Sequence, residues 1–189
     1  MTGAAPIAMD LAAVRAVLAA ARKLGGPVGT SIELCILTLA LPWEVVAIRL
    51  ERIQWQDGVV PVPARGGRER LLPLPVAAKS LILRIAGEGA GDGQAVTAGR
   101  GEPLQAHRLR LDRVLPALVA ASCAALPPWN FHGIRASAAK MMKEDGIDQE
   151  TLLAIFGRVR RGSNTSPEGS QMELAGAGIE RWNAIVTGR

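Results

Sequence analysis

The chain has 189 residues, of which 49% are hydrophobic and 21% charged, a composition typical of one well-buried globular domain and not of a disordered chain. It carries 22 Lys and Arg against 17 Asp and Glu, and the net charge of +5 favours an acidic partner. The longest uncharged apolar run, 34–43, is too short for a membrane span of about 20 residues. Because no basic segment precedes an apolar stretch at the start, we expect a cytoplasmic protein without a secretory signal or membrane contact.

The first part of the chain is predicted to be helical. Asp10 suits the N-cap of a helix that ends at residues 25–26, since apolar residues follow it at helical spacing. A second helix is predicted over 31–39, and its lack of a polar face indicates a central place in the core. Pro42 suits the first turn of a third, short helix.

Three short antiparallel strands are predicted next. Residues 53–56 and 59–62 flank an Asp-Gly pair at 57–58, which is a favoured two-residue hairpin turn. A further turn at 66–67 leads to a strand that ends at 71–74. These strands form one small sheet.

The rest of the chain is predicted to be mainly helical. Residues 87–103 read as a glycine-rich loop and 162–170 as a polar linker. The whole pattern predicts a mainly helical α+β fold, organised as a domain over 1–161 followed by a linker and a C-terminal helical segment over 162–189. The helices of this part are expected at 75–86, 104–125, 132–144, 148–156 and 171–187.

The positive charge concentrates in the middle of the chain. Residues 1–60 carry five basic and five acidic side chains, 61–113 carry nine and five, and 114–189 carry eight and seven. A second basic group lies at 158–161. Such groups are typical of a nucleic-acid contact or of a plain solvated face.

His132 and Arg135 stand at the start of the helix predicted over 132–144. Three residues apart, both side chains project from one face of the first turn. A helix N-terminus with these two donors favours a phosphate group. Taken alone, this pair is also common as a capping or surface pair.

Several motifs agree in order and spacing with one known family. They are an apolar helix pair over 32–50, a strand ending in Leu-Leu-Pro-Leu-Pro, the H-x-x-R helix, Ile-Phe-Gly-Arg at 155–158 and Ile-Glu-Arg-Trp at 179–182. Over nearly its whole length the sequence resembles the catalytic domain of the tyrosine recombinase (phage integrase) superfamily, in its prophage-type branch. The resemblance implies a helical catalytic domain with a three-stranded sheet, and a role in DNA recombination or integration by a mobile genetic element.

In that family a tyrosine attacks a DNA phosphodiester, and two arginines, a histidine, a lysine and a further His or Trp stabilise the developing charge. The resemblance places His132 and Arg135 at the H-x-x-R positions and Arg158 at the late His or Trp position. It places Arg65 at the lysine position, with Arg68 as the next candidate. A guanidinium there keeps the charge but is a poor proton donor, because its pKa exceeds about 12.

Two positions lack the residue that the family uses for catalysis, an arginine at one and a tyrosine at the other. The first arginine stands three residues before a glutamate, and the matching Glu44 places Leu41 in that position. The nucleophile would fall at 166–170, but none of the 189 residues is a tyrosine. Ser166 and Ser170 are not expected to replace it, because a serine hydroxyl has a high pKa and no general base lies nearby in the sequence. The sequence therefore predicts a degenerate recombinase without strand cleavage.

The retained charges still favour DNA as a partner. We expect salt-dependent binding to the backbone of duplex DNA. No metal-ligand spacing and no nucleotide-binding loop occurs, so neither a metal nor a cofactor is expected. Family members carry an N-terminal domain that closes a clamp around DNA, and since the resemblance begins almost at Met1, we expect weaker contact unless a partner supplies that half. The residues expected to contact phosphates are Arg65, Arg68, His132, Arg135, Arg158, Arg160 and Arg161.

Other interpretations remain open. Recombinases of this family pass a C-terminal segment to a neighbouring protomer. If this chain keeps that exchange without the DNA role, it is a regulatory pseudoenzyme that oligomerises through 162–189 with copies of itself or with a full-length recombinase. It would alternatively be an active recombinase that receives its tyrosine from another chain, or a decayed fragment of a mobile element.

Overall fold

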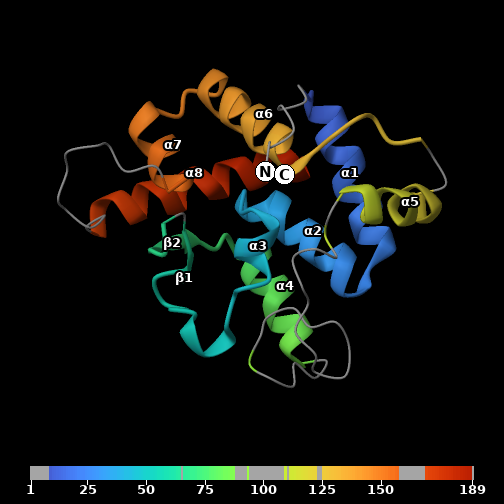
Figure 1. The fold of residues 1–189 in the computed structure, drawn as a ribbon. Coiled ribbons are helices and arrows are strands. Elements are labelled where there is room, and N and C mark those ends of the chain that lie inside the picture. Colours follow the sequence, from blue (N-terminus) through green and yellow to red (C-terminus); the bar gives the residue numbers. More distant parts are fainter. Residues whose placement is uncertain are drawn as a thin grey trace.

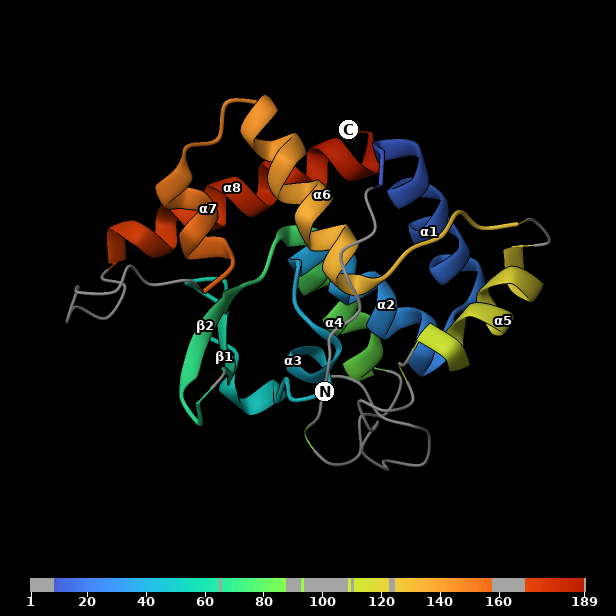
Figure 2. The same cartoon turned by 45° about the horizontal axis from the view of Figure 1, so that its top comes forward.

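The computed structural model places helices α1 to α8 and one small sheet around a single core (Figures 1 and 2). Helix α2 lies at the centre, with α6, α7 and α8 on one side of it and α4 on the other. Among the residues described, no helix has the length and apolar character that a membrane span requires. The structure describes residues 9–64, 66–87, 93, 109, 111–122, 125–157 and 169–188.

Helix α1 (Leu11–Leu24) begins and ends where the sequence predicts. The Asp10 carboxylate accepts a hydrogen bond from the backbone N–H of Ala13 at 2.7 Å, which caps the first turn. Gly25, with φ of 59°, ends the helix in a conformation that glycine adopts without strain. Both ends are therefore set by local residues.

Helix α2 (Gly26–Thr38) is buried on nearly all sides, as its missing polar face predicts. Its predicted start at residue 31 is wrong by five residues, because Pro27 suits the first helical turn. Ser31 lies inside the helix, where its hydroxyl donates to the carbonyl of Pro27 at 2.7 Å. The helix ends at Leu39, whose φ of 54° is left-handed and whose side chain is fully buried. This turn directs the chain into α3 (Pro42–Val45).

The sheet has two antiparallel strands, β1 (Val59–Pro63) and β2 (Glu69–Pro73), within the described residues. The third strand predicted over 53–56 is wrong. Gln54 makes only an isolated bridge to Val59, since its carbonyl accepts from the N–H groups of both Gly58 and Val59 and closes a tight turn. The preceding residues, Leu50–Arg52, form a 3-10 turn and leave no length for a strand.

The helices predicted over 75–86, 132–144, 148–156 and 171–187 are confirmed to within two residues at each end. The helix predicted over 104–125 is too long, because Leu109 lies in a 3-10 turn and residue 125 lies outside the helix. The helix predicted over 104–125 is described only in its second part, with Pro116 inside it. Most of the predicted loop at 87–103, and residues 162–168 of the predicted linker, lie outside the described residues. The observed helices are α4 (Val76–Gly87), α5 (Leu111–Ser122), α6 (Phe131–Glu144), α7 (Gln149–Ile155) and α8 (Gly169–Thr187).

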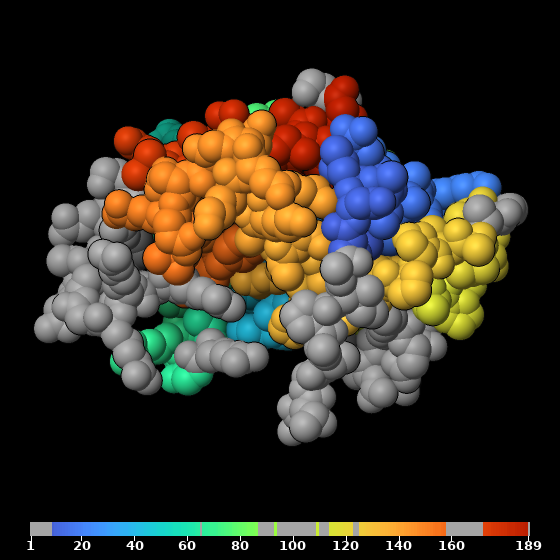
Figure 3. Space-filling model, turned by 90° about the horizontal axis from the view of Figure 1, so that it is seen from above, coloured from blue at the N-terminus to red at the C-terminus, as the bar shows by residue number. Residues whose placement is uncertain are grey.

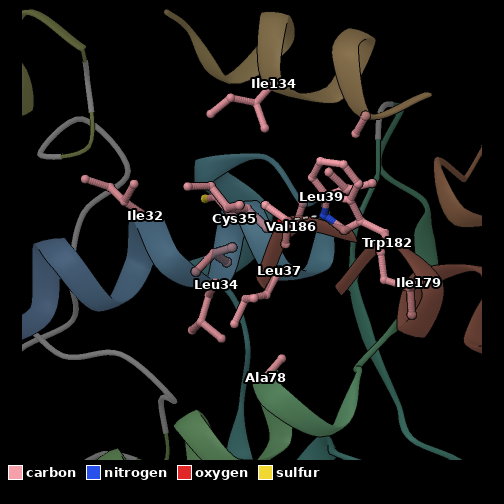
Figure 4. Packing of buried hydrophobic residues seen from close by; sticks show 14 of the residues in the cluster. Ile32, Leu34, Cys35, Leu37, Leu39, Ala78, Ile134, Ile179, Trp182 and Val186 are labelled. Atoms are coloured by element: carbon pink, nitrogen blue, oxygen red, sulfur yellow. Dashed lines mark hydrogen bonds between the residues drawn. The ribbon is translucent and has the colours of Figure 1, made fainter. Parts of the chain in front are cut away.

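Helix α8 closes the core of its own chain. Ala175, Ile179, Trp182 and Val186 lie on one helical face and are buried in the cluster that also contains α2. The indole N–H of Trp182 donates to the carbonyl of Ile36 at 2.8 Å. Figure 4 shows side chains of α2, α4, α6 and α8 meeting in this cluster. Residues on both sides of the predicted boundary at 161/162 thus share one core, and an exchange of the C-terminal segment stays a prediction.

Replacing Trp182 with alanine is expected to lower the free energy of unfolding by about 3–5 kcal/mol, because a buried ring is lost and a cavity remains. Urea unfolding followed by circular dichroism measures this loss. The matched control is Glu173→Ala on the exposed side of the same helix, which should leave the unfolding midpoint unchanged. Equal midpoints for both variants would contradict the packing of α8 on its own core.

Candidate nucleic-acid interface

One buried carboxylate, that of Glu44 on α3, joins three elements of the fold. Its Oε1 accepts a hydrogen bond from Nε of Arg70 on β2 at 2.6 Å. Its Oε2 accepts from the backbone N–H of Leu41 at 2.6 Å and from Nη1 of Arg135 on α6 at 3.3 Å. The Glu44 side chain is only 4% exposed, so these contacts lie in a region of low solvent screening.

Arg70 enters this cluster from the inner face of β2. Side chains two residues apart on a strand share a face, and Leu72, two residues on, is fully buried. Nη1 of Arg70 donates to the carbonyl of Ile155 at the end of α7, at 3.3 Å. Gly157 has a φ of +65°, and a Cβ there would stand 2.4 Å from Cδ of Arg70. Glycine is needed at 157 for the backbone conformation and also for the passage of Arg70.

The H-x-x-R pair lies on the first turns of α6. Asn130 caps this helix by accepting from the N–H of Gly133 at 2.6 Å. Arg135 is held from a second side by Phe156, whose carbonyl accepts from Nη2 at 3.5 Å and whose ring centre lies 5.1 Å from the guanidinium. His132 is exposed and makes no hydrogen bond to a described residue. In Figure 3, α6 and α7 form the middle of the face seen from above.

Counted over the described residues, the cluster has more positive than negative charge. The guanidinium groups of Arg70 and Arg135, 9% and 16% exposed, share the single carboxylate of Glu44. Beside the cluster, burial raises the pKa of the Cys35 thiol, Glu44 raises it further and Arg135 lowers it, so the thiol stays protonated. The described charges of the cluster therefore favour a bound anion.

Of the residues expected from the sequence, the structure brings Leu41 close to Arg135, which shares the first turns of α6 with His132. Leu41 lies beside Arg135, since both donate to the same Glu44 oxygen, and it offers no side-chain charge. Arg68 is exposed on the turn between β1 and β2. Ser170 lies in the first turn of α8. The remaining expected residues lie outside the described part of the chain: Arg65, Arg158, Arg160, Arg161 and Ser166.

Sequence reasoning missed Arg70 as a site residue and used Glu44 only as a marker of position. A signal for Arg70 was present in the sequence. Alternation along the strand places residues 70 and 72 on one face, and a charged residue on the core face of a strand requires a partner. The partner itself, 26 residues earlier in the chain, had no local signal.

The model of the phage integrase family matches residues 9–161 of the chain. The chain belongs to the phage integrase family. This confirms the resemblance seen in the sequence, and the fold is that of a tyrosine recombinase catalytic domain. A comparison of the chain with curated proteins finds no significant match.

Solved structures of recombinases share the fold of this chain at low sequence identity. The integrase from mycobacterium phage Brujita is 17% identical with a TM-score of 0.64, over 96% of this chain and 60% of that one. XerA recombinase is 11% identical with a TM-score of 0.62, over 95% and 64%. The lambda integrase catalytic core is 18% identical with a TM-score of 0.61, over 84% and 95%. The chain thus spans less than two thirds of the length of the first two proteins and nearly all of the lambda core.

Replacing Glu44 with glutamine is expected to destabilise the chain by about 3–5 kcal/mol, because two buried cations lose their carboxylate. Adding Arg70→Met should restore part of that loss by removing one of the two cations. Urea unfolding of the wild type, both single variants and the double variant measures the coupling.

The matched control for this cycle is Glu69→Gln on the same strand as Arg70. Glu69 pairs with Arg52, and both side chains are about half exposed, so its loss should shift the unfolding midpoint far less. A double variant less stable than Glu44→Gln alone would contradict the excess of buried positive charge.

Proposed function

We propose that this integrase-family chain binds the backbone of duplex DNA through the face around His132 and Arg135 and neither cleaves nor joins strands. The observation that carries the proposal is the Arg135 guanidinium, held by Glu44 and Phe156 beside an exposed His132, in a chain without tyrosine. Lambda integrase, which shares the fold, is known as a dimer bound to a COC′ core site and as a tetramer bound to a Holliday junction.

The binding half of the proposal rests on fixed cations. Arg135 keeps its geometry without DNA, so little conformational entropy is lost when a phosphate arrives. His132 and Arg68 add exposed groups that meet a phosphate at the cost of ordering their side chains. Contacts of this kind are made to the backbone, so they do not distinguish one base sequence from another.

The chemical half of the proposal rests on missing groups. Without tyrosine no phosphotyrosyl bond forms, and the covalent route is closed. Leu41 provides only its backbone N–H, which is already bonded to Glu44. Since removal of one electrostatic contact in such a site costs about 10²–10³ in rate, losses at both positions together leave no measurable turnover.

Oligomerisation through residues 162–189 has less support as the main function. The apolar face of α8 already fills the core of its own chain, and Trp182 is bonded to Ile36 there. An exchanged arm would have to leave that core. Lambda integrase forms a dimer and a tetramer on DNA. A second copy of this chain, or a full-length recombinase, therefore stays a proposed partner on DNA.

Binding to a short duplex is expected to weaken steeply with salt, with log K falling by about 0.9 per neutralised phosphate for each unit of log salt. The double variant His132→Ala/Arg135→Ala should bind about tenfold more weakly and with a smaller slope, because charged contacts are lost. Fluorescence anisotropy at several salt concentrations measures both, with folding checked by circular dichroism.

The matched control for the binding experiment is Lys140→Ala on the same helix, which removes one exposed cation that pairs with Glu144. It should change the affinity less than about twofold. Wild-type binding that persists unchanged from low to high salt would contradict the proposal.

The unmodified chain is expected to form no covalent complex with nicked or suicide duplex substrates, because it has no phenol to attack phosphorus. Denaturing gels detect such complexes. The variant Leu41→Arg/Ser166→Tyr restores both missing groups and tests whether they suffice. Cleavage by the unmodified chain would overturn the chemical half of the proposal.

A further inference from the structure

The guanidinium of Arg135 is held by contacts of different kinds. Glu44 holds it with a carboxylate, which accepts from Nη1 and carries the opposite charge. Phe156 holds it with the face of a ring, whose centre lies 5.1 Å from Cζ of Arg135. A ring face attracts a cation through its quadrupole and adds no net negative charge. The contact with the ring therefore fixes the guanidinium without neutralising it.

The two bonds that Glu44 makes to arginines differ in length. Nε of Arg70 lies 2.6 Å from one oxygen, whereas Nη1 of Arg135 lies 3.3 Å from the other. A hydrogen bond between a guanidinium and a carboxylate is usually about 2.7–2.9 Å long. Arg135 thus stops short of the closest approach to Glu44, on the side where the ring and carbonyl of Phe156 hold it.

Phe156 is fixed by the helix that it ends. Its backbone N–H donates to the carbonyl of Leu152 at 3.1 Å, in the last turn of α7. The helix is capped at its start by Asp148, whose carboxylate accepts from the N–H of Thr151 at 2.9 Å. Leu152 is buried in the core, and the Phe156 ring packs half-buried against it. The ring is therefore a firm support for a neighbouring side chain.

Arg135 lies next to the exposed face of α6. His132 and Ala136, four residues apart, are both exposed, and Arg135 is the helical neighbour of His132. Figure 3 shows α6 in the middle of one face of the molecule. The Arg135 side chain is 16% exposed, so part of it is open to a ligand. With so little of the side chain open, a small movement toward Glu44 changes what a phosphate on this face reaches.

We propose that Phe156 is a positioning residue for phosphate binding, whose ring holds the guanidinium of Arg135 back from Glu44 and within reach of a phosphate on the exposed face of α6. This inference rests on the proposed DNA binding. It assigns to an uncharged residue at the end of α7 a role in the affinity for DNA.

The test compares Phe156→Leu with Phe131→Leu in duplex binding at fixed salt. Leucine keeps an apolar side chain and the backbone carbonyl at 156, so only the ring is lost and binding should weaken about fivefold. Phe131 is also half-buried, but its ring packs against Trp129 with the centres 5.2 Å apart. Its replacement should change the affinity less than about twofold, because an aromatic pair and no charged contact is lost. Phe156→Trp keeps a ring face and should retain the wild-type affinity.

A double-mutant cycle separates positioning from a merely structural role. In the background of Arg135→Ala the ring has no cation to hold, so Phe156→Leu should cause no further loss of affinity. A ring that only stabilised the end of α7 would weaken binding equally in both backgrounds. Circular dichroism checks the folding of each variant.

A further measurement uses the wild type alone and does not depend on the folding of a variant. The ring signals of Phe156 are followed by NMR during titration with the same duplex and with inorganic phosphate. Phosphate bound at Arg135 should shift these signals. The indole N–H signal of Trp182, which is buried and bonded to the carbonyl of Ile36, should stay in place.

The outcomes separate the two proposals. Salt-dependent binding by the wild type, with a loss in Phe156→Leu that requires Arg135, supports the inference. Equal affinity of Phe156→Leu and Phe131→Leu, equal losses in both backgrounds, or unmoved Phe156 signals while the duplex binds overturn the inference and leave the proposed function intact. Absence of duplex binding by the wild type even at low salt overturns both.

Discussion

The geometry of the candidate site depends on the carboxylate of Glu44. This group bonds the start of α3, the inner face of β2 and the first turns of α6, which lie 26 and 91 residues further along the chain. Few other interactions in the described residues connect so many elements through one side chain. Because the carboxylate is almost fully buried, its two oxygens fix the guanidinium groups that surround it, and the site has its shape before a ligand arrives.

The proposed function separates two physical tasks, the binding of a phosphate and the breaking of its ester bond. Holding a phosphate needs positive charge and fixed donors, and the guanidinium of Arg135 is fixed by Glu44 and by the carbonyl of Phe156. Breaking a phosphodiester bond needs a nucleophile, and no residue of the sequence provides a phenol. Electrostatic binding does not require a nucleophile, because the two tasks depend on different atoms.

Arg70 also shows how position in the chain and position in space differ. Aligned by motif, the sequence has Leu41 where the family has an arginine, which indicates a site short of one cation. In the folded chain a guanidinium from β2 lies one carboxylate away from that leucine. Gly157 makes this possible, since any Cβ at that place would collide with Arg70. A position that lacks a charge in the motif can therefore lie close to a charge from another element.

The sequence by itself determined the features that depend on neighbouring residues. Asp10 and Asn130 cap α1 and α6 through contacts three residues long, and the order of the motifs gave the family. Tertiary structure decided the features that depend on distant residues: the third strand that shortened to a bridge at Gln54, the closure of the core by α8, and the pairing of Arg70 with Glu44. The physical reason is that caps and turns are fixed by local hydrogen bonds, whereas a buried charge takes its partner from whichever element packs against it.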